Sequence, residues 1–128
     1  CIKAKVTVEA LPGPTALIPA LVASGMPSDR FIFEGFLPLK KGRKSRIREW
    51  LNEKRTIVFY ESPHRLLRCL NEMQSILGES RDMCIAREIS KLHETYHRGT
   101  IGEMLIYFSE NEVRGEIVII ISGKDEKI

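Results

Sequence analysis

Residues 56–78 have the sequence TIVFYESPHRLLRCLNEMQSILG, and this stretch decides the fold class. Its first five residues form a continuous apolar run of strand length, which is typical of an inner strand covered on both faces. Ser62 can cap the following helix, Pro63 suits its first position, apolar residues recur every three or four positions, and Gly78 ends it. The stretch therefore predicts a buried strand that leads directly into an amphipathic helix.

The same alternation continues on both sides of this stretch. The sequence predicts strands at residues 31–37, 56–60, 83–86 and 116–121, and helices at residues 15–24, 43–54, 62–77 and 100–108. Residues 4–11 are predicted to be extended, 87–99 are polar and of undetermined type, and 124–128 form a frayed tail. Pro19 implies that the first helix either begins near Ala16 and bends or begins only at the proline. We expect an α/β fold: a mixed sheet of about five strands flanked by helices.

Size and composition indicate one domain. The chain has 128 residues, of which 43% are hydrophobic and 29% charged, and Pro12-Gly13-Pro14 marks a boundary near its start. No apolar run approaches the roughly 20 residues that span a bilayer, and the first residues do not resemble a signal peptide, so we expect a soluble, cytoplasmic protein. Three distant cysteines, Cys1, Cys69 and Cys84, indicate neither a disulfide framework nor a thiolate metal site.

The charge is unevenly distributed. Residues 40–55 carry eight basic and two acidic side chains, or +6, whereas the rest of the chain sums to −3 from twelve basic and fifteen acidic residues. Such a cluster is expected of a nucleic-acid contact, although a solvated helix face would have the same composition. With Gly42 to give mobility, five residues are predicted to clamp a nucleic-acid backbone: Lys40, Lys41, Arg43, Lys44 and Arg46.

Polar residues follow two of the predicted strands. Ligand sites of α/β sheets gather at the carboxyl ends of strands, which is where the segment Glu61 to Arg65 and the pair Arg87-Glu88, with Lys91, are expected. Capping by Ser62 and a surface ion pair are the structural alternatives. The chain contains neither a G-x-x-x-x-G-K-[ST] nor a G-x-G-x-x-G motif, so nothing in it predicts a nucleotide site by itself.

Residues 93–97, His-Glu-Thr-Tyr-His, match the H-E-x-x-H signature of zinc hydrolases. Zinc binding would need both imidazoles on one face of a stable helix. Thr95 and Tyr96 favour a strand, Gly99 follows at once, and there is no third histidine at the expected spacing. We therefore predict two ordinary polar histidines on an edge strand or loop, and no metal.

Taken in order, these segments resemble one family. Its motifs are matched by Pro12 to Ala16 with Ala20 to Gly25, Asp29 to Phe31, Gly35 to Pro38, Lys40 to Arg43, Val58 to Leu66, Ala86 to Glu88, Lys91 to Glu94, Arg98 to Thr100 and Arg114 to Val118. Together they resemble the second domain of the ribosomal RNA small subunit methyltransferase I family, within the tetrapyrrole-methylase superfamily. Pro19 is a minor departure from the pattern.

The resemblance implies a two-domain, usually dimeric enzyme that binds S-adenosylmethionine between its domains. It implies methyl transfer to the ribose 2′-hydroxyl of a cytidine in the decoding region of small-subunit ribosomal RNA. Residues 1–11 would then be the remnant of an interdomain strand or linker, and residues 12–128 the C-terminal domain. The glycine-rich domain that holds much of the cofactor would be absent, so this chain alone is expected to be inactive. The matching cofactor contacts are Thr15, Ala16, Glu61 and Ile89.

A ribose hydroxyl is a poor nucleophile until its proton is engaged, so an acceptor at the strand ends would help. Glu61 and Glu88 are the candidates. The predicted RNA contacts beside them are His64, Arg65, Arg87 and Lys91, in addition to the clamp. Two other functions remain open: a non-catalytic RNA-binding module, and methylation of a tetrapyrrole precursor, against which the basic segment argues.

Overall fold

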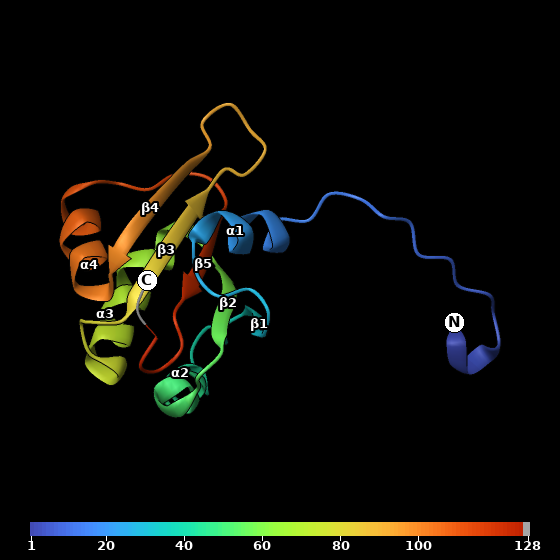
Figure 1. The fold of residues 1–128 in the computed structure, drawn as a ribbon, viewed down its shortest axis with the longest axis horizontal. Coiled ribbons are helices and arrows are strands. Elements are labelled where there is room, and N and C mark those ends of the chain that lie inside the picture. The colour runs from blue at the N-terminus through green and yellow to red at the C-terminus, as the bar shows by residue number, and fades with distance from the viewer. Residues whose placement is uncertain (127–128) are drawn as a thin grey trace.

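The computed structural model describes residues 1–126 and has an α/β fold (Figure 1). Its five strands are β1 (Phe31–Phe36), β2 (Thr56–Glu61), β3 (Asp82–Arg87), β4 (Thr95–Thr100) and β5 (Ile117–Ile121). Its helices are α1 (Leu17–Ser24), α2 (Arg43–Glu49), α3 (Leu66–Leu77) and α4 (Ile101–Glu110), with short 3-10 helices η1 (Ile2–Ala4), η2 (Trp50–Asn52) and η3 (Pro63–Arg65). No described helix is long and apolar enough to cross a membrane.

The sheet is mixed, with the strand order β1-β2-β5-β3-β4. β1 pairs parallel to β2, whereas β5 runs antiparallel to both β2 and β3, and β4 runs antiparallel to β3. β1, β2 and β3 therefore point the same way, and their carboxyl ends meet at one edge of the sheet, where β5 begins. This confirms the predicted fold class of a mixed, five-stranded sheet.

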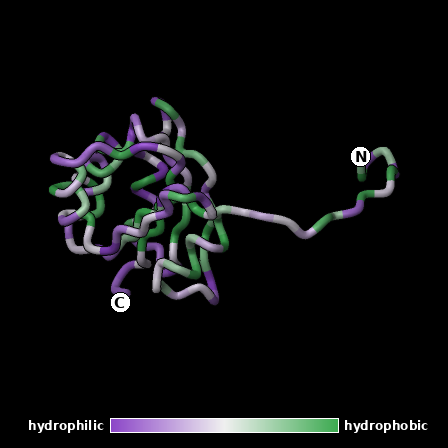
Figure 2. Tube along the Cα trace, turned by 90° about the horizontal axis from the view of Figure 1, so that it is seen from above, coloured by the Kyte–Doolittle hydropathy of each residue, from purple (hydrophilic) through white to green (hydrophobic). Residues whose placement is uncertain are grey.

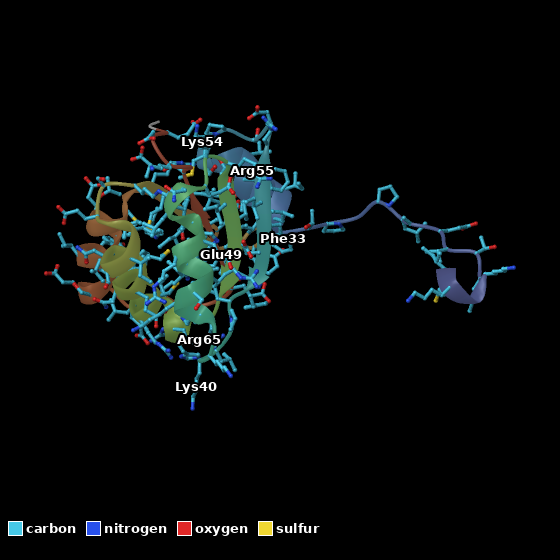
Figure 3. The ribbon with its side chains drawn as sticks, turned by 90° about the horizontal axis from the view of Figure 1, so that it is seen from below. Phe33, Lys40, Glu49, Lys54, Arg55 and Arg65 are labelled. Carbon is cyan, nitrogen blue, oxygen red and sulfur yellow. The ribbon has the colours of Figure 1, made fainter. Side chains whose placement is uncertain are left out.

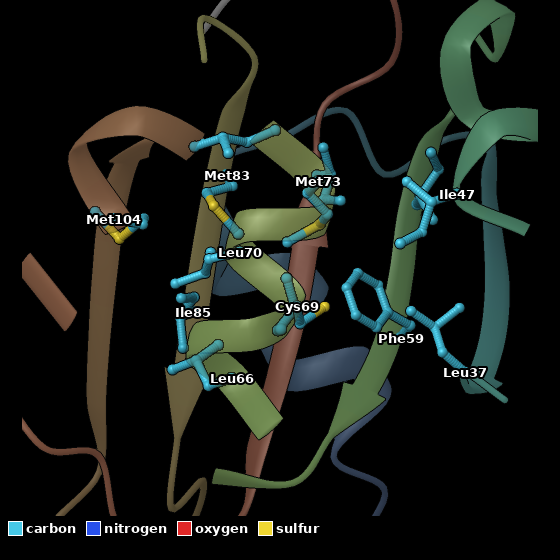
Figure 4. Packing of buried hydrophobic residues seen from close by; sticks show 14 of the residues in the cluster. Leu37, Ile47, Phe59, Leu66, Cys69, Leu70, Met73, Met83, Ile85 and Met104 are labelled. Atoms are coloured by element: carbon cyan, nitrogen blue, oxygen red, sulfur yellow. The ribbon is translucent and has the colours of Figure 1, made fainter. Parts of the chain in front are cut away.

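Helices cover both faces of the sheet. Alternate residues of β2, such as Ile57 and Phe59, face α2, α3 and α4, while Val58 faces α1 together with Val118 and Ile120 of β5. Figure 4 shows α3 presenting Leu66, Cys69, Leu70 and Met73 to the strands in one continuous cluster. β2 is thus covered on both faces, as its apolar run predicts.

Local signals explain most helix boundaries. Ser62 Oγ accepts a hydrogen bond from the His64 N–H, and Thr100 and Glu103 form the predicted capping box. Pro19 lies in the first turn of α1, where the N–H that proline lacks would have no acceptor within the helix, so α1 begins at Leu17 without a break. Gly78 adopts a positive φ of 88° and ends α3.

The two ends of the chain differ from the predictions. Residues 5–16 are irregular and exposed, and they extend away from the body, as Figures 1 and 2 show. The predicted frayed tail is wrong for Lys124, whose N–H donates to the Glu53 carbonyl (2.6 Å) and whose ammonium donates to Asn52 (2.9 Å). Residues 127 and 128 lie outside the described residues.

Candidate functional site

A cavity of about 540 Å³ lies at the edge where the parallel strands end. It is lined by Ala16, Phe36, Tyr60, Glu61, Ser62, Pro63, Glu88, Gly115, Glu116, Ile117 and Val118. Glu61 ends β2, and Glu88 follows directly after β3. The structure therefore brings together the two carboxylates that the sequence places after separate strands.

Glu61 is held by neighbours on both carboxylate oxygens. Oε1 accepts from the Ser62 N–H (2.8 Å) and from Arg65 Nε (3.0 Å), and Oε2 accepts from Arg43 Nη2 (2.7 Å). The Glu61 side chain is only 2% exposed. A carboxylate with this many partners is fixed in place, and both of its oxygens are already occupied by donors of the protein.

Glu88 is the more accessible acid of the two. Its side chain is 18% exposed and forms an ion pair with Lys91 Nζ at 2.7 Å, while Lys91 also contacts Glu116 at 3.2 Å. The hydrogen bond from Lys91 lowers the pKa of Glu88 despite some burial, and the hydrogen bonds to Glu88 and Glu116 raise the pKa of Lys91. Glu88 is therefore a charged hydrogen-bond acceptor at neutral pH.

The backbone around Glu88 is adapted to this position. Glu88 itself has a positive φ of 52°, and its N–H donates to the Glu116 carbonyl at 2.9 Å. Gly115 has a φ of 82°, and a Cβ added there would overlap the Glu88 carboxylate. Gly115 thus gives the carboxylate room, and in the sequence its only signal is its place in an Arg-Gly-Glu motif.

The aromatic wall of the cavity was not predicted from the sequence. The Tyr60 ring lies 5.1 Å from the ring of Phe33 and 5.5 Å from that of Phe36. A register shift between Phe33 and Phe36, at Gly35 with a φ of 62°, places Phe36 opposite Tyr60. A signal was present, because Phe36 and Tyr60 lie at the carboxyl ends of two predicted strands.

Most of the predicted basic clamp is exposed. Lys40 and Lys41 lie in the loop that leaves the cavity wall after Phe36, Lys44 lies on α2, and none of the three forms an ion pair within residues 1–126. Figure 3 shows Lys40 and Arg65 at one end of the molecule and Lys54 and Arg55 at the other. Arg46 is 45% exposed and pairs with Glu34 at 2.7 Å.

Arg43 is a correction to the predicted clamp. It is 1% exposed, and its guanidinium donates to Glu61 and Glu72 in the interior. A side chain that is buried and already paired with two carboxylates is not available to a phosphate. Arg43 is therefore a structural residue of the interior and not an RNA contact.

The remaining predicted contacts lie around the cavity with different roles. His64 is exposed and lines a second hollow of about 470 Å³, which shares Pro63 and Gly115 with the first. Arg65 is partly exposed and holds Glu61, and Arg87 Nε donates to the Arg114 carbonyl. The structure thus gathers these residues at the predicted edge, although several of them also hold protein groups.

The predicted cofactor contacts are only partly brought together. Ala16 lines the cavity and Thr15 is exposed directly before it. Ile89 follows Glu88 but packs against the cluster beneath α1 and is not among the lining residues.

The H-E-x-x-H segment does not form a helix. His93 lies in a turn and His97 on the edge strand β4, where its ring packs 5.0 Å from Tyr107 and 5.2 Å from Phe108. This confirms the predicted edge strand or loop. Within residues 1–126, no group of three or more His, Cys, Asp or Glu side chains could hold a metal ion.

Comparison with known proteins identifies relatives of this chain. The family model described as Tetrapyrrole (Corrin/Porphyrin) Methylases matches residues 1–105. The ribosomal RNA small subunit methyltransferase I of Escherichia coli O157:H7 is 49% identical over 126 residues, which cover 96% of this chain and 44% of that protein. The protein of the same name from Thermotoga maritima is 42% identical over 125 residues, which cover 98% of this chain and 56% of that protein. The chain spans about half the length of these curated relatives.

Solved structures share the fold. The methyltransferase CobJ has a TM-score of 0.67 at 19% identity, covering 98% of this chain and 55% of that chain. Uroporphyrin-III C-methyl transferase from Thermus thermophilus, complexed with S-adenyl homocysteine, has a TM-score of 0.61 at 21% identity, covering 94% of this chain and 55% of that chain. The predicted likeness to one domain of the tetrapyrrole-methylase fold is thereby confirmed.

Proposed function

Because this chain belongs to the tetrapyrrole (corrin/porphyrin) methylases, we propose that it is the C-terminal domain of a methyltransferase that acts on small-subunit ribosomal RNA. The observation that carries the proposal is the cavity at the sheet edge, where an accessible carboxylate and an apolar wall lie beside an exposed basic loop. Identities of 42% and 49% to relatives named for this reaction support it. The target that we propose is the ribose 2′-hydroxyl of a cytidine in the decoding region.

The cavity suits S-adenosylmethionine, which supplies an electrophilic methyl group on a sulfonium when bound. Tyr60, Ile117 and Val118 offer apolar and aromatic surface of the kind that an adenine ring contacts. The carboxylates of Glu61 and Glu88 are negative groups beside a site for a cation. Thr15 and Ala16 complete the contacts that we propose on this side of the cofactor, whereas Ile89 packs beneath α1 and does not line the cavity.

The residues of this chain then act mainly by positioning. Methyl transfer is an in-line displacement, so the rate depends on holding the hydroxyl oxygen against the methyl carbon and excluding water. Glu88 is the acceptor that we propose for the hydroxyl proton, because its carboxylate is charged and partly exposed, whereas Glu61 is occupied by Arg43, Arg65 and Ser62. His64, Arg65, Arg87 and Lys91 are proposed to hold the RNA nearby.

We further propose that a glycine-rich domain precedes this one in the whole protein and that residues 1–11 link the two. The exposed arm supports this, since Val6, Val8 and Leu11 are more than half exposed, as are Ile2 and Val22. Apolar surface of this kind is usually covered in an assembled protein. The whole protein is proposed to be a cytoplasmic homodimer, and the 128-residue chain alone to be inactive.

Two other functions make different demands. Methylation of a tetrapyrrole precursor fits the fold, but it gives no role to the exposed lysines Lys40, Lys41 and Lys44. A non-catalytic RNA-binding module would use those lysines but would need neither the cavity nor an upstream domain. The methyltransferase accounts for both features.

The proposal is tested by tritiated methyl transfer from S-adenosylmethionine to isolated small ribosomal subunits. The full-length protein is compared with the 128-residue chain. Label mapped to a ribose and found only with the full-length protein is the expected result. Inactivity of both, with RNA binding retained, would favour the RNA-binding module.

The basic loop gives a prediction for RNA affinity. Replacing Lys40 and Lys41 by alanine in the full-length protein is expected to weaken RNA binding at least about tenfold at low salt. Because two phosphate contacts are lost, the slope of log K against log salt concentration should also become shallower by about 1.5 to 2. The matched control replaces Lys54 and Arg55, which lie at the opposite end (Figure 3) and carry the same charge. Equal losses in both variants would contradict a localised clamp.

A further inference from the structure

Arg43, the first residue of α2, joins three separate elements. Its Nη2 donates to Glu61 Oε2 at the end of β2 (2.7 Å), and its Nε donates to Glu72 Oε2 within α3 (2.6 Å). Its Nη1 makes a longer bond, of 3.5 Å, to the carbonyl of Pro38 in the loop after β1. A single buried guanidinium therefore contacts the basic loop, the strand that carries the cavity wall and the central helix.

The acceptors of Arg43 are themselves anchored. Glu72 Oε1 accepts from Arg68 Nε at 2.8 Å, and Glu61 Oε1 accepts from Ser62 and Arg65. Burial disfavours the charge on Arg43, but its hydrogen bonds to Glu61 and Glu72 and the negative charges around it outweigh this and raise the pKa of the guanidinium. Each carboxylate of the network is thus held by donors on both of its oxygens, which leaves the network little freedom to rearrange.

We infer that Arg43 is a positioning residue that fixes the basic loop, residues 37–42, and the cavity wall at Ser62 and Pro63 in one relative placement. The inference rests on the proposed function, since it gives these two surfaces the RNA and the cofactor as ligands. Arg43 does not line the cavity and is almost fully buried, so it acts through Glu61 and the Pro38 carbonyl. Lysine cannot replace it, because an ammonium lacks the planar fork that reaches three acceptors in different directions.

The test compares Arg43→Lys with Arg48→Lys in the full-length protein. Arg48 lies on the same helix and is exposed, so the control makes the same chemical change outside the buried network. Arg43→Lys is expected to lower kcat/KM for methyl transfer about tenfold or more, because a displacement of about 1 Å is costly to a positioned reaction. It is also expected to accelerate amide exchange in residues 37–46 and 61–65, whereas Arg48→Lys leaves both quantities unchanged.

An Arg43→Lys protein with normal kinetics and normal exchange would overturn the inference, even if its unfolding midpoint were lower, because Arg43 would then be an ordinary structural ion pair. If Arg43→Lys does not fold, Glu72→Gln removes the negative charge and one of the two acceptor oxygens that Arg43 and Arg68 share outside the cavity, and it must accelerate exchange in residues 37–46. If the wild-type protein transfers no methyl group to RNA, the proposed function fails, while amide exchange still decides the role of Arg43.

Discussion

Replacement of Arg43 by methionine is expected to lower the free energy of unfolding by about 3–5 kcal/mol, the usual effect of removing one partner from a buried ion pair. Glu72 would keep only Arg68, and Glu61 would keep Arg65 and the Ser62 N–H, so that neither buried carboxylate would face a buried cation. Urea denaturation monitored by circular dichroism measures the loss, and an unchanged m-value would show that the unfolded state is unaffected.

A triple variant distinguishes lost charge pairing from lost packing. Arg43→Met combined with Glu61→Leu and Glu72→Leu removes every buried charge of the network, and such complete replacements are often neutral or stabilising. We therefore expect the triple variant to recover most of the stability that the single variant loses. If the triple variant has a lower free energy of unfolding than Arg43→Met, the loss of stability does not come from unpaired buried carboxylates, and the ion pairs themselves stabilise the fold.

The same network gives the fold a dependence on acid. Burial alone would raise the pKa of Glu72, but hydrogen bonds from Arg43 and Arg68 leave it lowered. A carboxylate with a lowered folded-state pKa stabilises the fold above its unfolded pKa, and this contribution is lost as the pH falls through the folded value. Removing Arg43 should therefore reduce the loss of stability on acidification.

Glu88→Gln is expected to lower kcat for methyl transfer by about a hundredfold, the lower range for loss of a positioned proton acceptor. Glutamine keeps the volume beside Gly115 but is neutral and cannot hold a proton from the ribose hydroxyl. Because Glu88 is partly exposed, the free energy of unfolding of the Glu88→Gln protein should differ little from that of the wild type. Single-turnover kinetics with the full-length protein and isolated small subunits measure the chemical step.

Two further variants serve as a matched control for Glu88→Gln and as a test of the second carboxylate. Glu94→Gln makes the same change in the same loop, where Glu94 contacts Ser90 and Tyr96 and does not line the cavity, so it should retain wild-type turnover. Glu61→Gln should lower stability, because its amide would place a donor against the Arg43 guanidinium. Full turnover in both Glu88→Gln and Glu61→Gln would exclude the two carboxylates from catalysis.

The position of the two carboxylates could be predicted from the sequence for a simple physical reason. Glu61 and Glu88 each follow an apolar run of strand length, and parallel strands bring their carboxyl ends to one edge. Strand β4 was predicted only as a polar segment of undetermined type, with its histidines on an edge strand or loop, because its residues are half exposed and polar and so carry no apolar alternation. Tertiary pairing with β3, rather than local preference, makes it a strand.

The burial of Arg43 was not predicted because five other residues between 40 and 48 are also basic, and composition does not distinguish among them. A signal was nevertheless present: Arg43, Ile47 and Trp50 are spaced by four and three residues and share one face of the helix, and all three are buried. An arginine in line with two large apolar residues indicates an interior position. The acceptors that it needs there, Glu61 and Glu72, come from distant segments, which spacing alone cannot reveal.

The central place of β5 has a consequence for how this domain acquires its structure during synthesis. β5 is the last strand along the chain, yet it separates β2 from β3 and pairs with both. A nascent chain that ends before residue 117 contains the β1-β2 pair and the β3-β4 hairpin, but it lacks the strand that pairs with both of them. The apolar faces of each half are then uncovered. The domain is therefore expected to complete folding only after residues 117–121 leave the ribosome, and to depend on protection from aggregation until then.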